Sequence, residues 1–93
     1  MLELGKVVMT RGICKRCKDS PTFSFLVQKA LSMHAEGNWG DLSDEDWEVN
    51  QQALKDGDTI LSSYWMDYEN KEKIWIITEG DRSVTTVLLP EEY

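Results

Sequence analysis

The sequence is poor in the residues from which most catalytic and metal sites are built. Its 93 residues include two cysteines, two prolines and a single histidine. A structural zinc ion takes four ligands, usually cysteine and histidine, so no zinc site is expected. No apolar run approaches the roughly 18 residues of a membrane-spanning helix. The first residues also lack the features of a signal peptide, so we expect a cytoplasmic protein with reduced cysteines.

The two cysteines form the motif Cys14-Lys-Arg-Cys17. Such a motif serves as half of a zinc site or as a redox pair. Zinc would need His34 and a further ligand that the sequence does not supply. A redox pair normally opens a helix within a thioredoxin-like βαβ unit, which is not predicted here. We therefore expect no metal and no cofactor, and incidental thiol reactivity because the basic neighbours should lower the thiol pKa.

Charge is distributed unevenly along the chain, whose net charge is −7. Residues 1–34 carry six basic and two acidic side chains, and residues 35–93 carry four basic and fifteen acidic ones. An acidic surface repels nucleic-acid phosphates and favours basic partners. Direct nucleic-acid binding is therefore disfavoured, and a regulator that binds DNA through Arg11, Lys15, Arg16 and Lys18 is the weakest of the hypotheses considered.

The first helix is predicted over residues 21–35. Ser20 is a suitable N-cap, and Pro21 suits the first helical position because its missing N–H costs nothing there. Side chains three and four residues apart then form one apolar stripe, and Gly37 suits the C-terminal cap. The stripe consists of Phe23, Leu26, Val27, Ala30, Leu31 and His34.

The second helix is predicted over residues 44–56. Ser43 and Asp46 resemble a capping box, and the carboxylates of residues 44–46 lie where the helix dipole favours negative charge. Gly57 suits the end of this helix. Its acidic start thus has a structural explanation.

Strands are predicted at residues 4–9, 59–68, 73–78 and 83–89, with residues 11–20 mostly as a loop. The order β-α-α-β-β-β predicts a single α+β domain over residues 1–93. Its antiparallel sheet would combine a three-stranded meander with the N-terminal strand, and two helices would cover one face. In so short a chain we expect the large apolar side chains in the core. These are Phe23, Phe25, Trp39, Trp47, Trp65 and Trp75.

A second interpretation is a small enzyme or ligand-binding domain. Its site would form where "GNWGD" meets "TEGDRS", if His34, Asp41, Glu79, Asp81 and Arg82 converge. Against this, His34 lies on the apolar stripe near a helix end, where its imidazole can bond to free carbonyl groups. The residues of "TEGDRS" suit a tight turn for conformational reasons. No complete catalytic set is recognisable, so the sequence favours a non-enzymatic protein.

Several blocks of the sequence, "GNWGDL", "QALKDG", "WIITEGDRS" and "LLPEEY", resemble a family of small proteins found on plasmids, phages and other mobile elements of bacteria. The resemblance covers residues 3–9 and 31–93 and leaves out the cysteine motif. The family has no settled activity. What the resemblance implies is an accessory gene of a mobile element, and many such genes protect the element from host defences.

These observations together predict an acidic protein-interaction module that inhibits a host defence system, of the anti-CRISPR or anti-restriction type, by nucleic-acid mimicry. The expected partner is a basic, nucleic-acid-handling protein, and no membrane partner is expected. A homodimer formed by strand-edge pairing stays open. The side chains expected to form the binding surface are Asp41, Asp44, Glu45, Glu48, Asp67, Glu69, Glu79 and Asp81.

Overall fold

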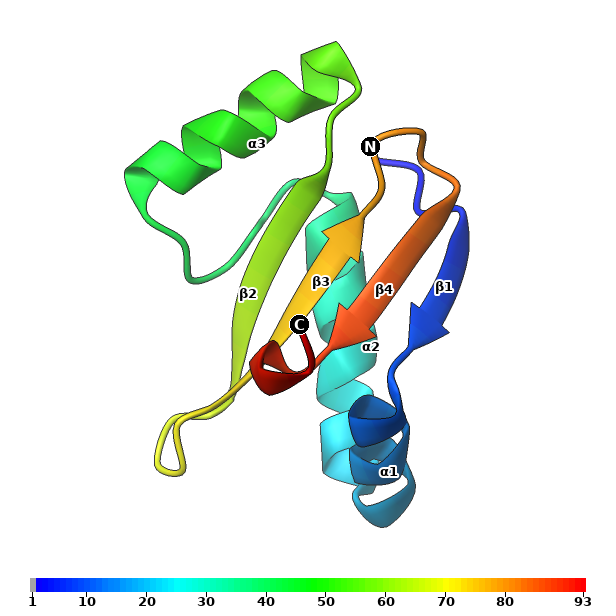
Figure 1. Ribbon diagram of the computed structural model, residues 1–93. Helices are drawn as coiled ribbons and strands as arrows, with labels where there is room; N and C mark the ends of the chain where they lie inside the picture. Colours follow the sequence, from blue (N-terminus) through cyan, green and yellow to red (C-terminus); the bar gives the residue numbers. More distant parts are fainter. Residues whose placement is uncertain (1) are drawn as a thin grey trace.

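The computed structural model describes residues 2–93, which form four strands and three helices around one sheet (Figure 1). In chain order the elements are β1 (Lys6–Met9), α1 (Arg11–Asp19), α2 (Pro21–Ala35), α3 (Asp44–Asp56), β2 (Ile60–Asp67), β3 (Glu72–Thr78), β4 (Val84–Leu88) and the 3-10 turn η1 (Pro90–Glu92). The predicted single α+β domain and the antiparallel meander β2-β3-β4 are confirmed. None of these helices is long and apolar enough to cross a membrane.

The prediction of a wholly antiparallel sheet is wrong at β1. The sheet has the strand order β1-β4-β3-β2, and β1 runs parallel to β4, with Lys6 opposite Val84 and Met9 opposite Val87. A strand pattern identifies the residues that are extended. It carries no information on the direction in which the strand enters the sheet.

The prediction of a loop over residues 11–20 is also wrong, because residues 11–19 form helix α1. Ile13 is completely buried in the main core, and Cys17, one turn later, packs against the same core. The Glu92 carboxylate accepts a hydrogen bond from the Gly12 N–H at 2.9 Å, which satisfies a free donor at the helix start. These contacts come from distant parts of the chain, so local periodicity does not reveal them.

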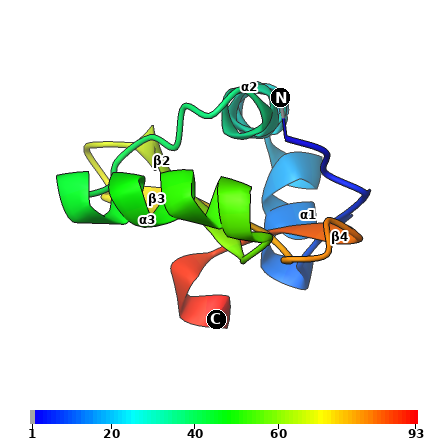
Figure 2. The ribbon, with the colours of Figure 1, turned by 90° about the horizontal axis from the view of Figure 1, so that it is seen from above.

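The helices do not share one face of the sheet as predicted. Seen from above, α2 covers one face, whereas α3 lies across the end of the sheet near β2 (Figure 2). The opposite face carries η1 and Tyr93, which packs edge-on against Trp75 with 5.7 Å between the ring centroids. Helix α1 packs mainly against α2.

Two apolar clusters hold these layers together. The larger one fills the space between α1, α2 and the sheet, and a smaller one under α3 contains Trp39, Ala53 and Ile60, with Trp47 against it. Four of the six large side chains expected in the core are not fully buried there. Trp47, Trp65 and Trp75 are half-buried, and Phe25 is 68% exposed.

The outer edge of β2 is closed over part of its length. Residues 39–41, here called the strap, pair with Ser63: the Ser63 N–H donates to the Trp39 carbonyl, and the Asp41 N–H donates to the Ser63 carbonyl. Gly40 has a φ of +73°, and a Cβ there would overlap the Ser63 carbonyl oxygen, so this approach requires glycine. Nearly two turns into α3, the Asn50 amide bonds to both the N–H and the carbonyl of Leu61.

The burial of Ile13 predicts that α1 is part of the cooperative fold. Substitution Ile13→Ala should lower the free energy of unfolding by about 2–5 kcal/mol, because it removes buried side-chain volume and leaves a cavity. Phe25→Ala, on the exposed side of α2, is the control and should change it by less than about 0.5 kcal/mol. Urea unfolding of both variants measures this, and equal small effects would contradict the packing of α1.

Candidate functional site

His34 is the centre of a buried chain of hydrogen bonds. It lies in the last turn of α2 and is 0% exposed. Its Nδ1 bonds to the Ser62 hydroxyl of β2, and its Nε2 lies 2.8 Å from Thr78 Oγ1 of β3. Thr78 Oγ1 is 2.7 Å from Thr85 Oγ1 of β4, which donates to the Leu4 carbonyl at 2.7 Å. The chain of contacts thus connects α2 with three strands and with the segment before β1.

The direction of each hydrogen bond follows from the last acceptor. A carbonyl oxygen only accepts, so the single hydroxyl hydrogen of Thr85 goes to Leu4. Thr78 must then donate to Thr85 and accept from His34 Nε2–H. In a neutral imidazole, Nδ1 then carries no hydrogen and accepts from Ser62. The imidazole is neutral, and one tautomer satisfies both ring nitrogens and both threonine hydroxyls.

Burial supports this assignment, since it lowers the pKa of His34 from 6.5 to about 4. The expected bond from this imidazole to free helix carbonyls is not present, and its partners are hydroxyl groups instead. A general base must reach the proton that it abstracts. With no exposed surface, His34 is here a structural group.

The other residues of the alternative site have separate partners. Asp41 bonds to Lys73 at 2.8 Å, and this ammonium group lowers the Asp41 pKa. Asp81 accepts hydrogen bonds from the N–H and hydroxyl of Ser83 within its own turn, which lowers its pKa. The structure thus brings residues 79–82 together in one turn but engages Asp41 and His34 elsewhere.

Arg82 donates hydrogen bonds to backbone carbonyl groups. Its guanidinium donates to the carbonyls of Asp58 at 2.7 Å, Ala53 at 3.1 Å and Glu79 at 3.3 Å. The carbonyls of Ala53 and Asp58 lie at the C-terminal end of α3, where a cation is favourable. Arg82 therefore fastens the end of α3 to the turn between β3 and β4.

The acidic residues gather on and around α3, a helix with little buried surface. Only Asn50 and Ala53 of this helix are buried, and Trp47 is half-buried. Residues 41–58 contain one basic side chain, Lys55, and seven carboxylates, all exposed. The carboxylates are those of Asp41, Asp44, Glu45, Asp46, Glu48, Asp56 and Asp58.

The eight acidic side chains expected to form one surface do not all lie on this helix. Asp41, Asp44, Glu45 and Glu48 belong to α3 and the segment before it, and Glu79 and Asp81 lie in the turn that Arg82 joins to the end of α3. Asp67 and Glu69, by contrast, lie at the β2-β3 turn, at the opposite end of the sheet (Figure 1).

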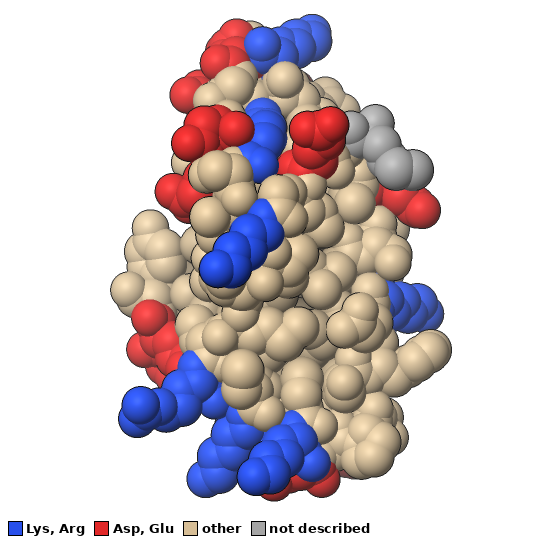
Figure 3. All heavy atoms as spheres, turned by 90° about the vertical axis from the view of Figure 1, so that its right-hand side faces the viewer, with Lys and Arg blue, Asp and Glu red and all other residues tan. Residues whose placement is uncertain are grey.

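The two ends of the molecule differ in charge. Helices α1 and α3 lie at opposite ends in Figure 1, and the molecule is 38 Å long. The face shown in Figure 3 carries most of its acidic side chains in the upper part, and basic side chains predominate at the lower end, where α1 lies. The basic side chains of α1 are thus far from the acidic side chains on and around α3, whereas Glu72, also from the acidic part of the sequence, lies at the basic end and pairs with Arg16.

The cysteines of α1 are free thiols. Burial raises the pKa of the Cys17 thiol, opposite to the lowering expected from its basic neighbours. Cys14 is exposed. Within residues 2–93 no cluster of three or more potential metal ligands is present.

Comparisons with protein families, with curated proteins and with solved structures found no match for this chain. The resemblance to proteins of mobile elements therefore stays a prediction.

Two features of the surface were not identified from the sequence. Val49 and Leu54 are 62% and 44% exposed on α3, within the acidic region, although apolar residues in an amphipathic helix normally face the core. A groove lies between α2 and β2, lined in part by Met33, Trp65 and Met66. The exposure of Val49 and Leu54 could have been suspected, because the few apolar residues of α3 do not form a regular stripe. No local pattern in the sequence indicates the groove.

The low pKa of His34 predicts a pH-dependent stability. Between pH values of about 4 and 6.5 the unfolded chain binds more protons than the folded chain. The free energy of unfolding should therefore decrease as pH falls through this window, by about 3 kcal/mol in total. Chemical unfolding at a series of pH values measures this decrease. His34→Gln should remove this contribution to the pH dependence of the free energy of unfolding. Identical slopes for the two proteins would contradict the assignment.

Proposed function

We propose that this protein is a non-enzymatic interaction module that binds a basic, nucleic-acid-handling protein through the acidic surface of α3. The observation that carries the proposal is the set of six exposed carboxylates against one lysine in residues 44–58, without Asp41, which pairs with Lys73. Such a surface raises the local concentration of basic partners and steers them into contact. It equally disfavours nucleic acid itself as the ligand.

The way in which α3 is attached supports its use as a binding element. Asn50, Ala53 and the half-buried Trp47 face the fold, and Arg82 holds the helix end. The other side chains of the helix are exposed and available to a partner. Val49 and Leu54 add apolar area within the acidic field. Protein interfaces combine an apolar centre with a charged rim, so this composition suits a protein partner.

The resemblance to proteins of mobile elements directs the proposal toward inhibition of a host defence system. Defence proteins of the CRISPR and restriction types hold nucleic acid in basic grooves. An acidic helix that occupies such a groove would compete with the nucleic acid for the same basic side chains. The mechanism proposed is therefore mimicry of nucleic-acid charge.

A matched pair of variants tests the acidic surface. Glu45→Gln with Glu48→Gln removes two charges from α3, and Glu69→Gln with Glu91→Gln removes two exposed charges elsewhere. Immobilised protein should retain bacterial nucleic-acid-binding proteins that duplex DNA displaces. The amount of DNA-displaced protein that the α3 variant retains should be lower by about tenfold or more, which corresponds to about 1.4 kcal/mol of binding free energy.

The control variant should retain the DNA-displaced proteins at the level of the unmodified protein, and thermal unfolding of both variants would establish that they are folded. Quantitative mass spectrometry of the retained proteins provides the measurement. Equal retention by both variants, or retention that DNA does not affect, would contradict charge mimicry by α3.

A further inference from the structure

The edge of β2 is left unpaired where the strap ends. Along this strand the outward-facing groups of Leu61 bond to Asn50, and those of Ser63 bond to the strap. Every second residue of a strand faces the same neighbour, so the next one is Trp65. Among residues 2–93, neither the N–H nor the carbonyl of Trp65 has a partner on that side. Two main-chain groups thus remain available for pairing.

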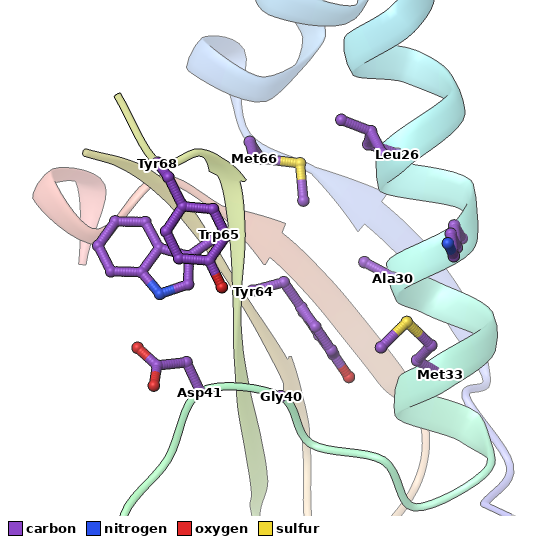
Figure 4. A pocket seen from close by; sticks show the side chains of 10 residues that line it. Leu26, Ala30, Met33, Gly40, Asp41, Tyr64, Trp65, Met66 and Tyr68 are labelled. Atoms are coloured by element: carbon purple, nitrogen blue, oxygen red, sulfur yellow. The ribbon is translucent and has the colours of Figure 1, made fainter. Parts of the chain in front are cut away.

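A groove of about 430 Å³, with a mixed apolar and polar lining, opens beside this unpaired stretch, between α2 and β2 (Figure 4). Leu26, Ala30 and Met33 of α2 face Tyr64 and Met66 of β2 across it. Unbranched methionine side chains adapt to the shape of a ligand. The groove therefore suits one flexible or branched apolar side chain.

The outer side of the groove is held in place by aromatic stacking. Trp65 and Tyr68 stack with 5.0 Å between ring centroids, and the Lys73 ammonium lies 4.5 Å from the Trp65 ring. Lys73 also bonds to Asp41 of the strap. This cluster lies where β2 is still paired with β3, at Trp65 opposite Lys73, just before the register of the two strands shifts between Trp65 and Asp67.

The charge at the groove is positive. Its two ionic lining residues are Lys29 and Asp41, and Asp41 is already neutralised by Lys73 at 2.8 Å. Lys29 is exposed and takes part in no ion pair within the described part of the chain. A carboxylate on the occupant would complement it.

We propose that an extended peptide segment of a protein partner adds to β2 alongside Trp65, with an apolar side chain in the groove and a carboxylate beside Lys29. The free N–H and carbonyl of Trp65 are the groups that a peptide main chain recognises, and the strap already pairs in this way with Ser63. Side chains of an added strand alternate between its two faces, so an apolar residue and a carboxylate two positions apart would both face α2. This site is separate from the acidic surface and does not rest on it.

Two blocked heptapeptides test the proposal, Thr-Glu-Thr-Leu-Thr-Glu-Thr and the same sequence with lysine in place of glutamate. Their symmetric sequences allow either strand direction. Titration into nitrogen-15-labelled protein should shift the Trp65 amide resonance downfield, and the glutamate peptide should bind at least about fivefold more tightly, or about 1 kcal/mol. Lys29→Glu should reverse this preference, and Lys55→Glu, on α3, should leave it unchanged.

N-methylation of the peptide separates strand pairing from unspecific apolar binding. Two peptides would be compared, one with methyl groups on the odd-numbered amides and one with methyl groups on the even-numbered amides. One of them should not bind, because its methylated amides face the β2 edge, and the affinity of the other should change by no more than about twofold. Absence of binding at about 2 mM, or equal effects of both methylation patterns, would overturn the proposal. The Glu45→Gln, Glu48→Gln variant should bind the peptide normally, so failure here is distinguishable from failure of the acidic-surface proposal.

Discussion

The neutral imidazole of His34 joins α2 to the sheet through side chains that have no contact with solvent. Its two ring nitrogens bond to β2 and β3, and the chain continues through Thr85 of β4 to Leu4. An unpaired polar group at any of these positions would cost about 1–3 kcal/mol. Burial of these hydroxyl groups and ring nitrogens is therefore favourable only when all of their hydrogen bonds are formed. The chain of hydrogen bonds therefore specifies how α2 lies over the strands.

The position of α2 determines what the edge of β2 presents. With α2 fixed by His34, the chain returns to the edge of the sheet as the strap, residues 39–41, and α3 follows with Asn50 against Leu61. One strand edge thus supports the acidic helix at one end and leaves Trp65 unpaired beside the groove at the other. Both proposed binding surfaces depend on the same packing of α2.

Local signals in the sequence were sufficient for some elements and insufficient for others. The bounds of α2 and α3 follow from Ser20, Ser43 and Gly57, whose hydrogen bonds or backbone conformation involve residues at most four positions away. Helix α1 depends on burial of Ile13 and on a bond to Glu92, 80 residues from Gly12, and neither is a local property.

The features of the candidate sites also divide into those that local sequence predicts and those that depend on long-range packing. The acidic character of residues 41–58 can be counted in the sequence, because a solvated helix keeps its charges exposed. The burial of His34 was predicted from the apolar stripe, but its partners Ser62 and Thr78 are 28 and 44 residues away. No spacing rule connects them, and the groove beside Trp65 likewise exists only after α2 and β2 have packed together.

The protonation state of the His34 ring is the most direct test of this account. Nitrogen-15 chemical shifts of the two ring nitrogens at neutral pH distinguish the tautomers and the imidazolium form. The hydrogen-bond chain predicts a neutral ring with its hydrogen on Nε2 and none on Nδ1. A ring protonated on Nδ1, or on both nitrogens, would contradict it.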